Sequence, residues 1–507
     1  MEQIKIGWGR EIYSLDEPVL LPGQMYMRVS EGIHDPLTVT ALCLDGGAGQ
    51  DCVIFCTLDI VVLRNGVIDL TVAKVREKHP EIPEKAIIMG ATHTHAGITL
   101  ADTPEVSPDG KKIYPGSKCR EHIVNQCAKA ICTAWENRKP GGIAFGYGYA
   151  VVAHSRRVAY FEDTNILHPN PVAPNGRAIM YGETNDPQFS DFEAGADHFV
   201  NALYTVDEAG KLTGIVCNIP CPSQLFEHQY EQSADYWHNV RESVKKEFGE
   251  DVYLLPQCAA AGDLSPRLLH YKAAQQRRMD LKYGLKYDYT RSVYDPNQAG
   301  LTDEGEHNKI EGERRDIAER VLKALHEIWG WAQKEIATEV PLTHVMETVE
   351  LDRRMITDEE VKWCEDSVKV LAQDLPRDGD KDALTVAVTK FNAIRARNER
   401  AIQRYKDQQT QPTIATKIHV LRVGEIAFAS NRFELYMDYM HRIQARSPFI
   451  QTFIIQLAGD EGGSYLATQR GREDKGYSAS LFCNQVSPEG GQQLVEETLR
   501  VLNEINA

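Results

Sequence analysis

The stretch Ala86-Ile87-Ile88-Met89-Gly90-Ala91-Thr92-His93-Thr94-His95-Ala96-Gly97 joins a short apolar run to a pair of histidines. The uninterrupted apolar run 86–89 is typical of a buried strand. Residues two apart on an extended segment point to the same side, so we expect His93 and His95 to project together from the end of this strand. Two neighbouring imidazoles can hold a metal ion or act on a substrate. Two histidines packed at the mouth of a loop would show the same spacing.

The sequence around this stretch alternates between strand-like and helix-like patterns. Strands are predicted over 41–44 and 53–58, and an amphipathic helix over 65–78 precedes the strand at 86–89. A second helix is predicted over 119–135 and is ended by Pro140-Gly141-Gly142. This alternation predicts an α/β fold in which mixed sheets are flanked by helices.

The rest of the chain continues in the same way. A hairpin is predicted over 200–218, with its turn at Asp207-Glu208-Ala209-Gly210. Thr357 and Glu360 form a capping box that opens a helix to about residue 371. Further helices are predicted over 235–248, 314–334, 387–405 and 491–503, and further strands over 252–255, 417–423, 426–429 and 453–457.

The chain shows no internal repeat or flexible linker, so we expect one large domain over 1–507. The polar segment 268–311 is an expected insertion within it. It could form a lid, an oligomer contact or a surface excursion without a role.

The composition limits the classes of partner. Lys and Arg number 56 against 73 Asp and Glu, a net charge of -17, which argues against nucleic acid and anionic membranes. No apolar stretch approaches the length of about eighteen residues that a membrane helix needs, so no membrane insertion is expected. The N-terminus lacks a signal-peptide pattern and the eleven cysteines are scattered, which predicts reduced thiols in the cytoplasm. The expected partner is a small-molecule substrate, and a homo-oligomer is compatible with the sequence.

Several segments match one family in order. They are Glu31-Gly32-Ile33-His34-Asp35-Pro36-Leu37, Leu58-Asp59, the motif 91–97, Gly262-Asp263-Leu264-Ser265-Pro266, and a C-terminal region with Glu434, Tyr465 and Tyr477. With these motifs the chain resembles the neutral (non-lysosomal) ceramidases, zinc-dependent amidases that release a fatty acid from sphingosine. The resemblance implies their catalytic domain without the C-terminal β-sandwich.

The resemblance also implies a set of site residues. It assigns zinc to His93, Glu434 and Tyr465, and it places His95 beside the metal, facing the substrate. Tyr477 and Arg156 match positions that hydrogen-bond the substrate or the oxyanion, and an Arg fork suits either group. Arg157 lies next to Arg156 and competes with it for this role. From its place at the end of a strand, Asp59 is expected to orient His93 or His95. Zinc is the implied metal, although mixed nitrogen and oxygen ligands also suit other divalent transition metals.

Two positions depart from the family pattern. Ala259 stands where the family has its serine nucleophile, and a methyl group excludes an acyl-enzyme at this position. Pro222 stands at about the position of the second zinc histidine. His228 and His238 are the candidates to replace that histidine, and we expect His228 to complete the metal site.

These features predict a zinc-dependent hydrolase that cleaves an amide or ester bond of a small polar soluble substrate with metal-activated water. A metal-dependent lyase or epimerase acting on a sugar-like acid is a second hypothesis. A binding protein that kept the fold and lost the catalytic site is a third.

Overall fold

The computed structural model describes residues 2–164, 176–285, 303–373, 381–459 and 462–507. The predicted insertion at 268–311 therefore lies partly outside the described residues. Its described part contains α5 (Lys272–Tyr283) and the first residues of α6 (Asp303–Ala332).

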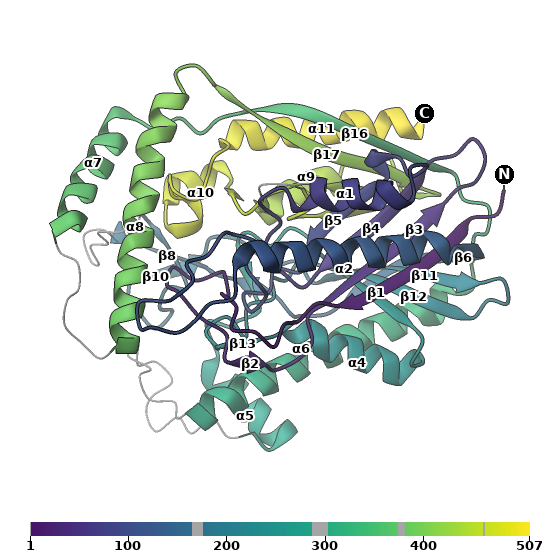
Figure 1. The fold of residues 1–507 in the computed structure, drawn as a ribbon, viewed down its shortest axis with the longest axis horizontal. Helices are drawn as coiled ribbons and strands as arrows, with labels where there is room; N and C mark the ends of the chain where they lie inside the picture. Colours follow the sequence, from purple (N-terminus) through teal and green to yellow (C-terminus); the bar gives the residue numbers. More distant parts are fainter. Residues whose placement is uncertain (1, 165–175, 286–302, 374–380, 460–461) are drawn as a thin grey trace.

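Two mixed β-sheets form the centre of the fold (Figure 1). In spatial order, the large sheet contains β14 (Tyr253–Cys258), β12 (Leu212–Ile219), β11 (Phe199–Asp207), β6 (Lys139–Tyr149), β1 (Lys5–Ile12), β3 (Thr38–Asp45), β4 (Cys52–Leu58) and β5 (Ile87–Ala91). The small sheet contains β16 (Leu342–Asp352), β17 (Thr413–Val423), β18 (Ile426–Ser430) and β20 (Gln451–Ile455). Parallel pairing occurs between β12 and β14, β4 and β5, and β18 and β20, and the other neighbours are antiparallel.

Strand alternation explains why the two sheets pack face to face. In β4, Val53 and Phe55 point into the core between the sheets, whereas Ile54 and Cys56 point to the opposite face. The ring centroids of Phe55 and Phe428 of β18 lie 4.9 Å apart across that core. A strand that is buried on both faces has no need of polar alternation, which is why these strands read as apolar runs.

Helices cover the two outer faces, so the described residues form four layers, α/β/β/α. On the large sheet, α1 (Val67–Lys78) and α2 (Gly116–Glu136) cover one half, and α4 (Tyr236–Phe248) and α6 cover the other. On the small sheet, α9 (Met437–Gln444) and α11 (Pro488–Asn506) form the outer layer. Figure 1 shows α2 lying along the strands of the large sheet and α11 lying beside β16 and β17.

Two glycines of β1 allow α2 to lie directly on the sheet. A Cβ atom at Gly7 or Gly9 would collide with the backbone carbonyl oxygens of Ala134 and Ala130 in α2. Side chains larger than hydrogen would therefore push the helix off the strand.

A helical pair stands at one end of the molecule. α7 (Asp358–Gln373) and α8 (Lys381–Asp407) pack against each other there (Figure 1). The capping box that opens α7 is confirmed, because Thr357 Oγ1 accepts from Glu360 N at 3.1 Å and Glu360 Oε2 accepts from Thr357 N at 3.0 Å.

Four short sheets and small helices complete the fold. The sheets are β8 (Arg157–Tyr160) with β9 (Ala178–Met180) and β10 (Phe189–Phe192), β2 (Gly32–Ile33) with β13 (Glu231–Gln232), β7 (His154–Ser155) with β15 (Leu264–Ser265), and β19 (Glu434–Leu435) with β21 (Tyr465–Leu466). The small helices are α10 (Gln469–Asp474) and two 3-10 turns at Glu84–Ala86 and Tyr477–Ala479. The predicted α/β class with flanking helices is confirmed.

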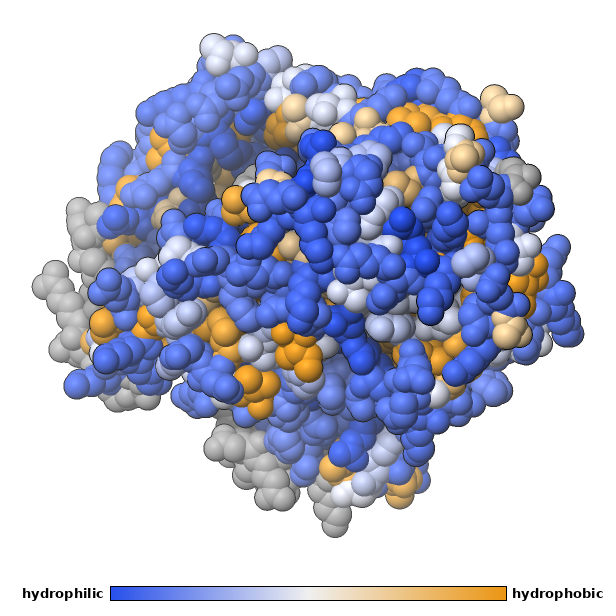
Figure 2. Space-filling model, turned by 45° about the vertical axis from the view of Figure 1, so that its right-hand side comes forward, coloured by the Kyte–Doolittle hydropathy of each residue, from blue (hydrophilic) through white to orange (hydrophobic). Residues whose placement is uncertain are grey.

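The surface and the thiols add two observations. Within the described ranges, no helix is both long and apolar enough to span a bilayer. On the face drawn in Figure 2, hydrophobic residues occur in separate groups among hydrophilic ones. All eleven cysteines are free thiols.

Candidate active site

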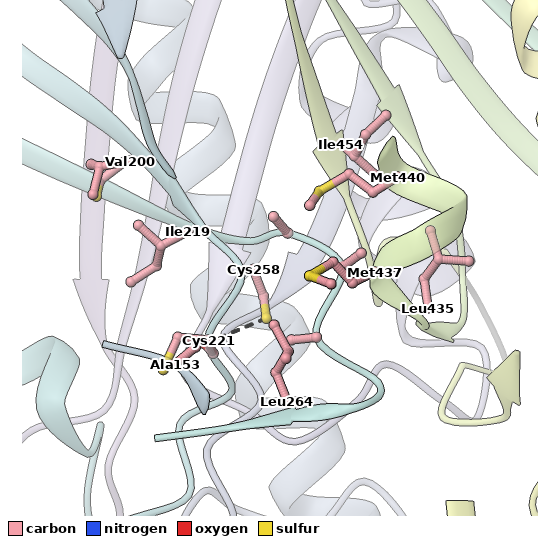
Figure 3. Close-up of a cluster of buried hydrophobic side chains, with 14 of the residues drawn as sticks. Ala153, Val200, Ile219, Cys221, Cys258, Leu264, Leu435, Met437, Met440 and Ile454 are labelled. Atoms are coloured by element: carbon pink, nitrogen blue, oxygen red, sulfur yellow. Dashed lines mark hydrogen bonds between the residues drawn. The ribbon is translucent and has the colours of Figure 1, made fainter. Parts of the chain in front are cut away.

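The segments that follow β5, β14, β18 and β20 meet at one place. Gly90 at the end of β5 forms a bridge with Ala458 after β20. The Gln456 amide donates to the Cys258 carbonyl at 3.0 Å, and the Gly262 amide donates to the Leu435 carbonyl at 2.8 Å. Figure 3 shows the apolar packing beneath this junction, including Cys258, Leu264, Leu435 and Met437.

His93 lies at the centre of the junction. Its backbone has φ 66°, a left-handed conformation that is unusual for a residue other than glycine. The His93 amide donates to the Ile60 carbonyl at 2.9 Å, and Nδ1 lies 2.8 Å from the Val61 carbonyl oxygen. Because a carbonyl oxygen only accepts, Nδ1 donates to it, and Nε2 faces the other site residues.

His95 meets His93, as predicted, but for a different reason. The two Nε2 atoms lie 3.3 Å apart. The backbone at His93 is left-handed rather than extended, so the turn brings the rings together, and simple alternation along a strand does not. Gly23, with φ 100°, lies against the His95 imidazole, and a Cβ atom there would overlap the ring.

Burial keeps His95 neutral. Burial lowers the pKa of His95 well below its ordinary value, and the neighbouring charges of His93 and Arg28 lower it further. Gln224 Nε2 lies 2.9 Å from His95 Nε2, and Glu227 Oε2 lies 3.3 Å from His95 Nδ1. The uncharged imidazole therefore has a donor at one nitrogen and a carboxylate at the other.

Glu434 brings a carboxylate to the histidines from β19. Its Oε2 lies 3.4 Å from His93 Nε2 and 3.6 Å from Arg156 Nη2. Burial by itself would raise the pKa of Glu434, but the charges of His93 and Arg156 and a hydrogen bond from Tyr465 lower it to about 2. The carboxylate is ionised at neutral pH.

Arg156 is fully buried and holds the site together. It donates at 3.1 Å to the Tyr465 hydroxyl, at 2.9 Å to the Gly262 carbonyl and at 3.0 Å to Gln224 Oε1. Among the described residues, no group accepts a hydrogen bond from its Nε. Arg157 points away from the site and donates to Glu193 Oε1 at 2.8 Å, so Arg156 is the arginine of this segment that faces the site.

The two tyrosines enclose the same end of the site. Tyr465 is paired with Glu434 in the short sheet of β19 and β21. The Tyr465 and Tyr477 rings lie 6.2 Å apart at 79°. Burial raises the pKa of Tyr465 well above its ordinary value, so the free phenol is protonated.

The structure corrects the role expected for Asp59. Arg241 of α4 donates to both carboxylate oxygens of Asp59, at 2.7 and 2.9 Å, and the amide and hydroxyl of Thr38 each donate to Oδ2 at 2.9 Å. These donors occupy the carboxylate, so Asp59 joins β4 to α4 and does not orient either histidine.

The expected fourth ligand is also corrected. The side chain of His228 is 47% exposed, and its Nδ1 lies 3.2 Å from the Tyr26 hydroxyl at the rim of the cavity. His238 lies on α4 and does not line this cavity. Gln224, four residues before His228, takes the place beside His95 that we expected for a histidine.

The site opens into a cavity of about 720 Å³. Besides the groups described above, its lining includes Met25, Arg64, Tyr181, Arg267, Arg397, Arg400, Arg404, Phe482 and Cys483. Sequence reasoning missed all five of these arginines. The helical spacing of Arg397, Arg400 and Arg404 was the available signal, because residues at this spacing lie on one face of a helix.

The site contains the kinds of side chain that bind zinc in catalytic sites. In the part of the chain that the structure describes, no three His, Cys, Asp or Glu side chains are gathered as a metal-binding group. His93 Nε2 lies within 3.4 Å of an imidazole nitrogen and of a carboxylate oxygen, and the Tyr465 hydroxyl bonds the same carboxylate. Neutral imidazole, carboxylate and phenol are the donor types of catalytic zinc sites, so the chemistry of the residues fits the metal.

Comparison with known proteins identifies the fold. No family model and no curated protein sequence matches the chain. Among solved structures, the neutral ceramidase from Pseudomonas aeruginosa matches with a TM-score of 0.65 and 16% identity over 99% of this chain and 75% of that one. A ceramidase complexed with C2 matches with a TM-score of 0.63 and 15% identity over 100% of this chain and 76% of that one. The chain has a neutral ceramidase fold.

Proposed function

We propose that this protein is a metal-dependent hydrolase that cleaves an amide or ester bond in a small polar molecule. The observation that supports this proposal is the group of two imidazoles and one ionised carboxylate at one end of the cavity, next to one buried guanidinium. The desolvation of charged groups is costly, and functional sites are one place where such groups are buried together. The structural relatives are ceramidases, which supports hydrolysis as the reaction class.

The metal would be held by His93 and Glu434, with Tyr465 as the neighbouring donor. Zinc is the proposed ion, and when bound it would polarise a carbonyl group and lower the pKa of water. The side chains of the protein would position the reacting groups. Arg156, which is buried behind the cavity wall, would hold the Tyr465 hydroxyl and the Glu434 carboxylate in place, and the neutral His95 would lie beside the metal and face the substrate.

A covalent serine route through position 259 is excluded by the residue found there. Ala259 is buried and offers only a methyl group. Its neighbour Cys258 is no substitute, because burial raises the pKa of this thiol to about 12 and keeps it protonated.

The cavity argues for a polar substrate in place of ceramide. Arginines and a glutamate line it together with the site residues, and a long aliphatic chain would leave these groups without partners. We propose that the enzyme acts on soluble molecules in the cytoplasm, where its free thiols remain reduced.

Metal analysis is the first test. We expect about one zinc per chain in the purified or reconstituted protein by inductively coupled plasma mass spectrometry, and its loss in His93→Ala. The matched control is His228→Ala, a histidine at the rim of the same cavity, which should keep the metal. Protein that stays metal-free after reconstitution with zinc, manganese and iron would refute metal dependence.

Product analysis in isotopically labelled water tests the reaction class. A panel of acylated amino acids, simple esters and sugar acids should yield a product that carries solvent oxygen in its new carboxylate. A product that carries solvent hydrogen on carbon, and no solvent oxygen, would refute hydrolysis and support the lyase or epimerase hypothesis. A metal-free protein without turnover would leave the binding hypothesis.

A further inference from the structure

The cavity has a charge opposite to that of the whole molecule. The chain carries a net charge of -17. Among the described residues that line the cavity, five are arginines and two are carboxylates, Glu227 and Glu434. The average composition of an acidic protein predicts a negatively charged pocket. The positive charge of this cavity therefore comes from the particular residues that line it.

Both lining carboxylates already have partners at the catalytic end. Glu227 Oε1 lies 2.6 Å from Arg267 Nη2. Glu434 lies between His93 and Arg156. Within the described part of the chain, no ion pair joins either carboxylate to the arginines that α8 presents to the cavity.

α8 directs one face into the cavity. Ala393, Arg397, Arg400, Ala401 and Arg404 line the cavity and follow the helical repeat. Arg404 has a structural role, because it donates at 2.6 Å to the Leu481 carbonyl and at 2.7 Å to the Asn484 carbonyl. Arg397 and Arg400 remain as the cations of this face.

Arg397 is surrounded by soft and aromatic groups. It donates at 3.3 Å to the sulfur atoms of Met25 and Cys483, and its guanidinium lies 5.1 Å from the Tyr477 ring and 4.8 Å from the Phe482 ring. Burial raises the pKa of Cys483, so this sulfur is a neutral thiol. Weak sulfur acceptors leave much of the hydrogen-bonding capacity of a guanidinium unused.

The neighbouring arginines repel one another. Burial lowers the pKa of Arg400, and the charges of Arg397 and Arg64 lower it further. Like charges held together at a cavity wall cost free energy that a bound anion would relieve.

We propose that Arg397 and Arg400, with Arg64 nearby, bind an oxyanion group of the substrate, either a carboxylate or a phosphate. The Tyr477 ring lies 5.1 Å from the Arg397 guanidinium and 6.2 Å from the Tyr465 ring, so the anionic group would bind on the Arg397 side of Tyr477. Planar guanidinium forks match both kinds of oxyanion. This inference rests on the proposed function in one respect only, namely that the bound anion belongs to a molecule that reacts at the His93 end.

The test measures anion binding in the His93→Ala background, so it does not depend on metal or turnover. Titration calorimetry with inorganic phosphate and with citrate should show saturable binding. Arg397→Gln and Arg400→Gln should each weaken it by about tenfold or more, the loss expected for a charged hydrogen bond. Arg395→Gln is the matched control, because Arg395 lies on α8 beside Glu399, at 3.2 Å, and does not line the cavity.

The outcomes of this titration either support or overturn the proposal. Tighter binding of citrate would indicate a carboxylate and tighter binding of phosphate a phosphate ester, and either supports the proposal. Unchanged binding in the Arg397→Gln/Arg400→Gln double variant would overturn it, as would the absence of binding to the parent protein. Arg400→Gln keeps the test valid if Arg397→Gln unfolds, because Arg400 is exposed. Anion binding by a metal-free, inactive protein would separate failure of the proposed function from failure of this inference.

Discussion

At the residue scale, hydrogen bonds between buried polar groups fix the orientations of the side chains in the site. Val61 determines which nitrogen of His93 carries the proton. Gln224 connects two parts of the site, because its Oε1 accepts from Arg156 and its Nε2 faces His95. This arrangement orients the amide without any metal.

Gln224→Leu tests this connection. The substitution keeps the approximate volume but removes one acceptor of Arg156 and the donor beside His95. We expect kcat/KM to fall by about tenfold or more, with zinc content unchanged. Gln485→Leu is the control, because Gln485 lines the same cavity and contacts neither group. Wild-type activity in Gln224→Leu would show that the amide only fills space.

At the element scale, buried polar contacts join elements that are distant in the sequence. The Asp59 and Arg241 pair connects the end of β4 to α4, and both side chains are buried. An ion pair of this kind contributes little in itself, but removing one partner leaves an uncompensated buried charge.

Arg241→Met should therefore lower the free energy of unfolding by about 3–5 kcal/mol, measured by urea denaturation. The control is Lys245→Met, one turn later on α4, where the ion pair with the half-exposed Glu242 predicts a loss of about 1 kcal/mol or less. Equal losses in the two variants would contradict the structural role of the pair.

Most helices were predictable, whereas three long strands were not. Local periodicity predicted α1, α2, α4 and α11 to within a few residues of their observed bounds. β1, β6 and β16 were missed. β1 and β6 are rich in glycine, which reads as turn sequence, although in β1 glycine is required for the approach of α2. Pro140-Gly141-Gly142, expected only to end a helix, lies within β6.

At the scale of the whole molecule, the contact between the two sheets contains a buried histidine pair. His344 Nε2 of β16 lies 3.0 Å from His419 Nδ1 of β17. Burial lowers the pKa of His344 to about 4, and burial together with the charge of His344 lowers that of His419 to about 3. The folded protein therefore resists protonation here, whereas unfolded histidines take up protons near pH 6.5.

Stability should fall as the pH drops below about 6.5 and should level off near the folded pKa values. His419→Gln should make this dependence shallower by up to about 1.4 kcal/mol per pH unit between pH 6 and 4.5. Urea denaturation at several pH values measures the slope. His326→Gln, at a histidine that is 65% exposed, controls for the loss of a surface imidazole. An unchanged slope in His419→Gln would exclude the buried pair as its source.

The sequence alone was sufficient for the α/β class and for most helix positions, because these follow from local periodicity. The resemblance of its motifs to those of the neutral ceramidases implied that His93, His95, Glu434 and Arg156 are neighbours. Only the tertiary structure assigned Asp59 to Arg241, moved His228 to the rim and brought the arginines of α8 to the same cavity as Glu434. The physical reason is that periodicity determines which face of an element is buried. Which distant group meets that face is decided when the two sheets and their helices pack together.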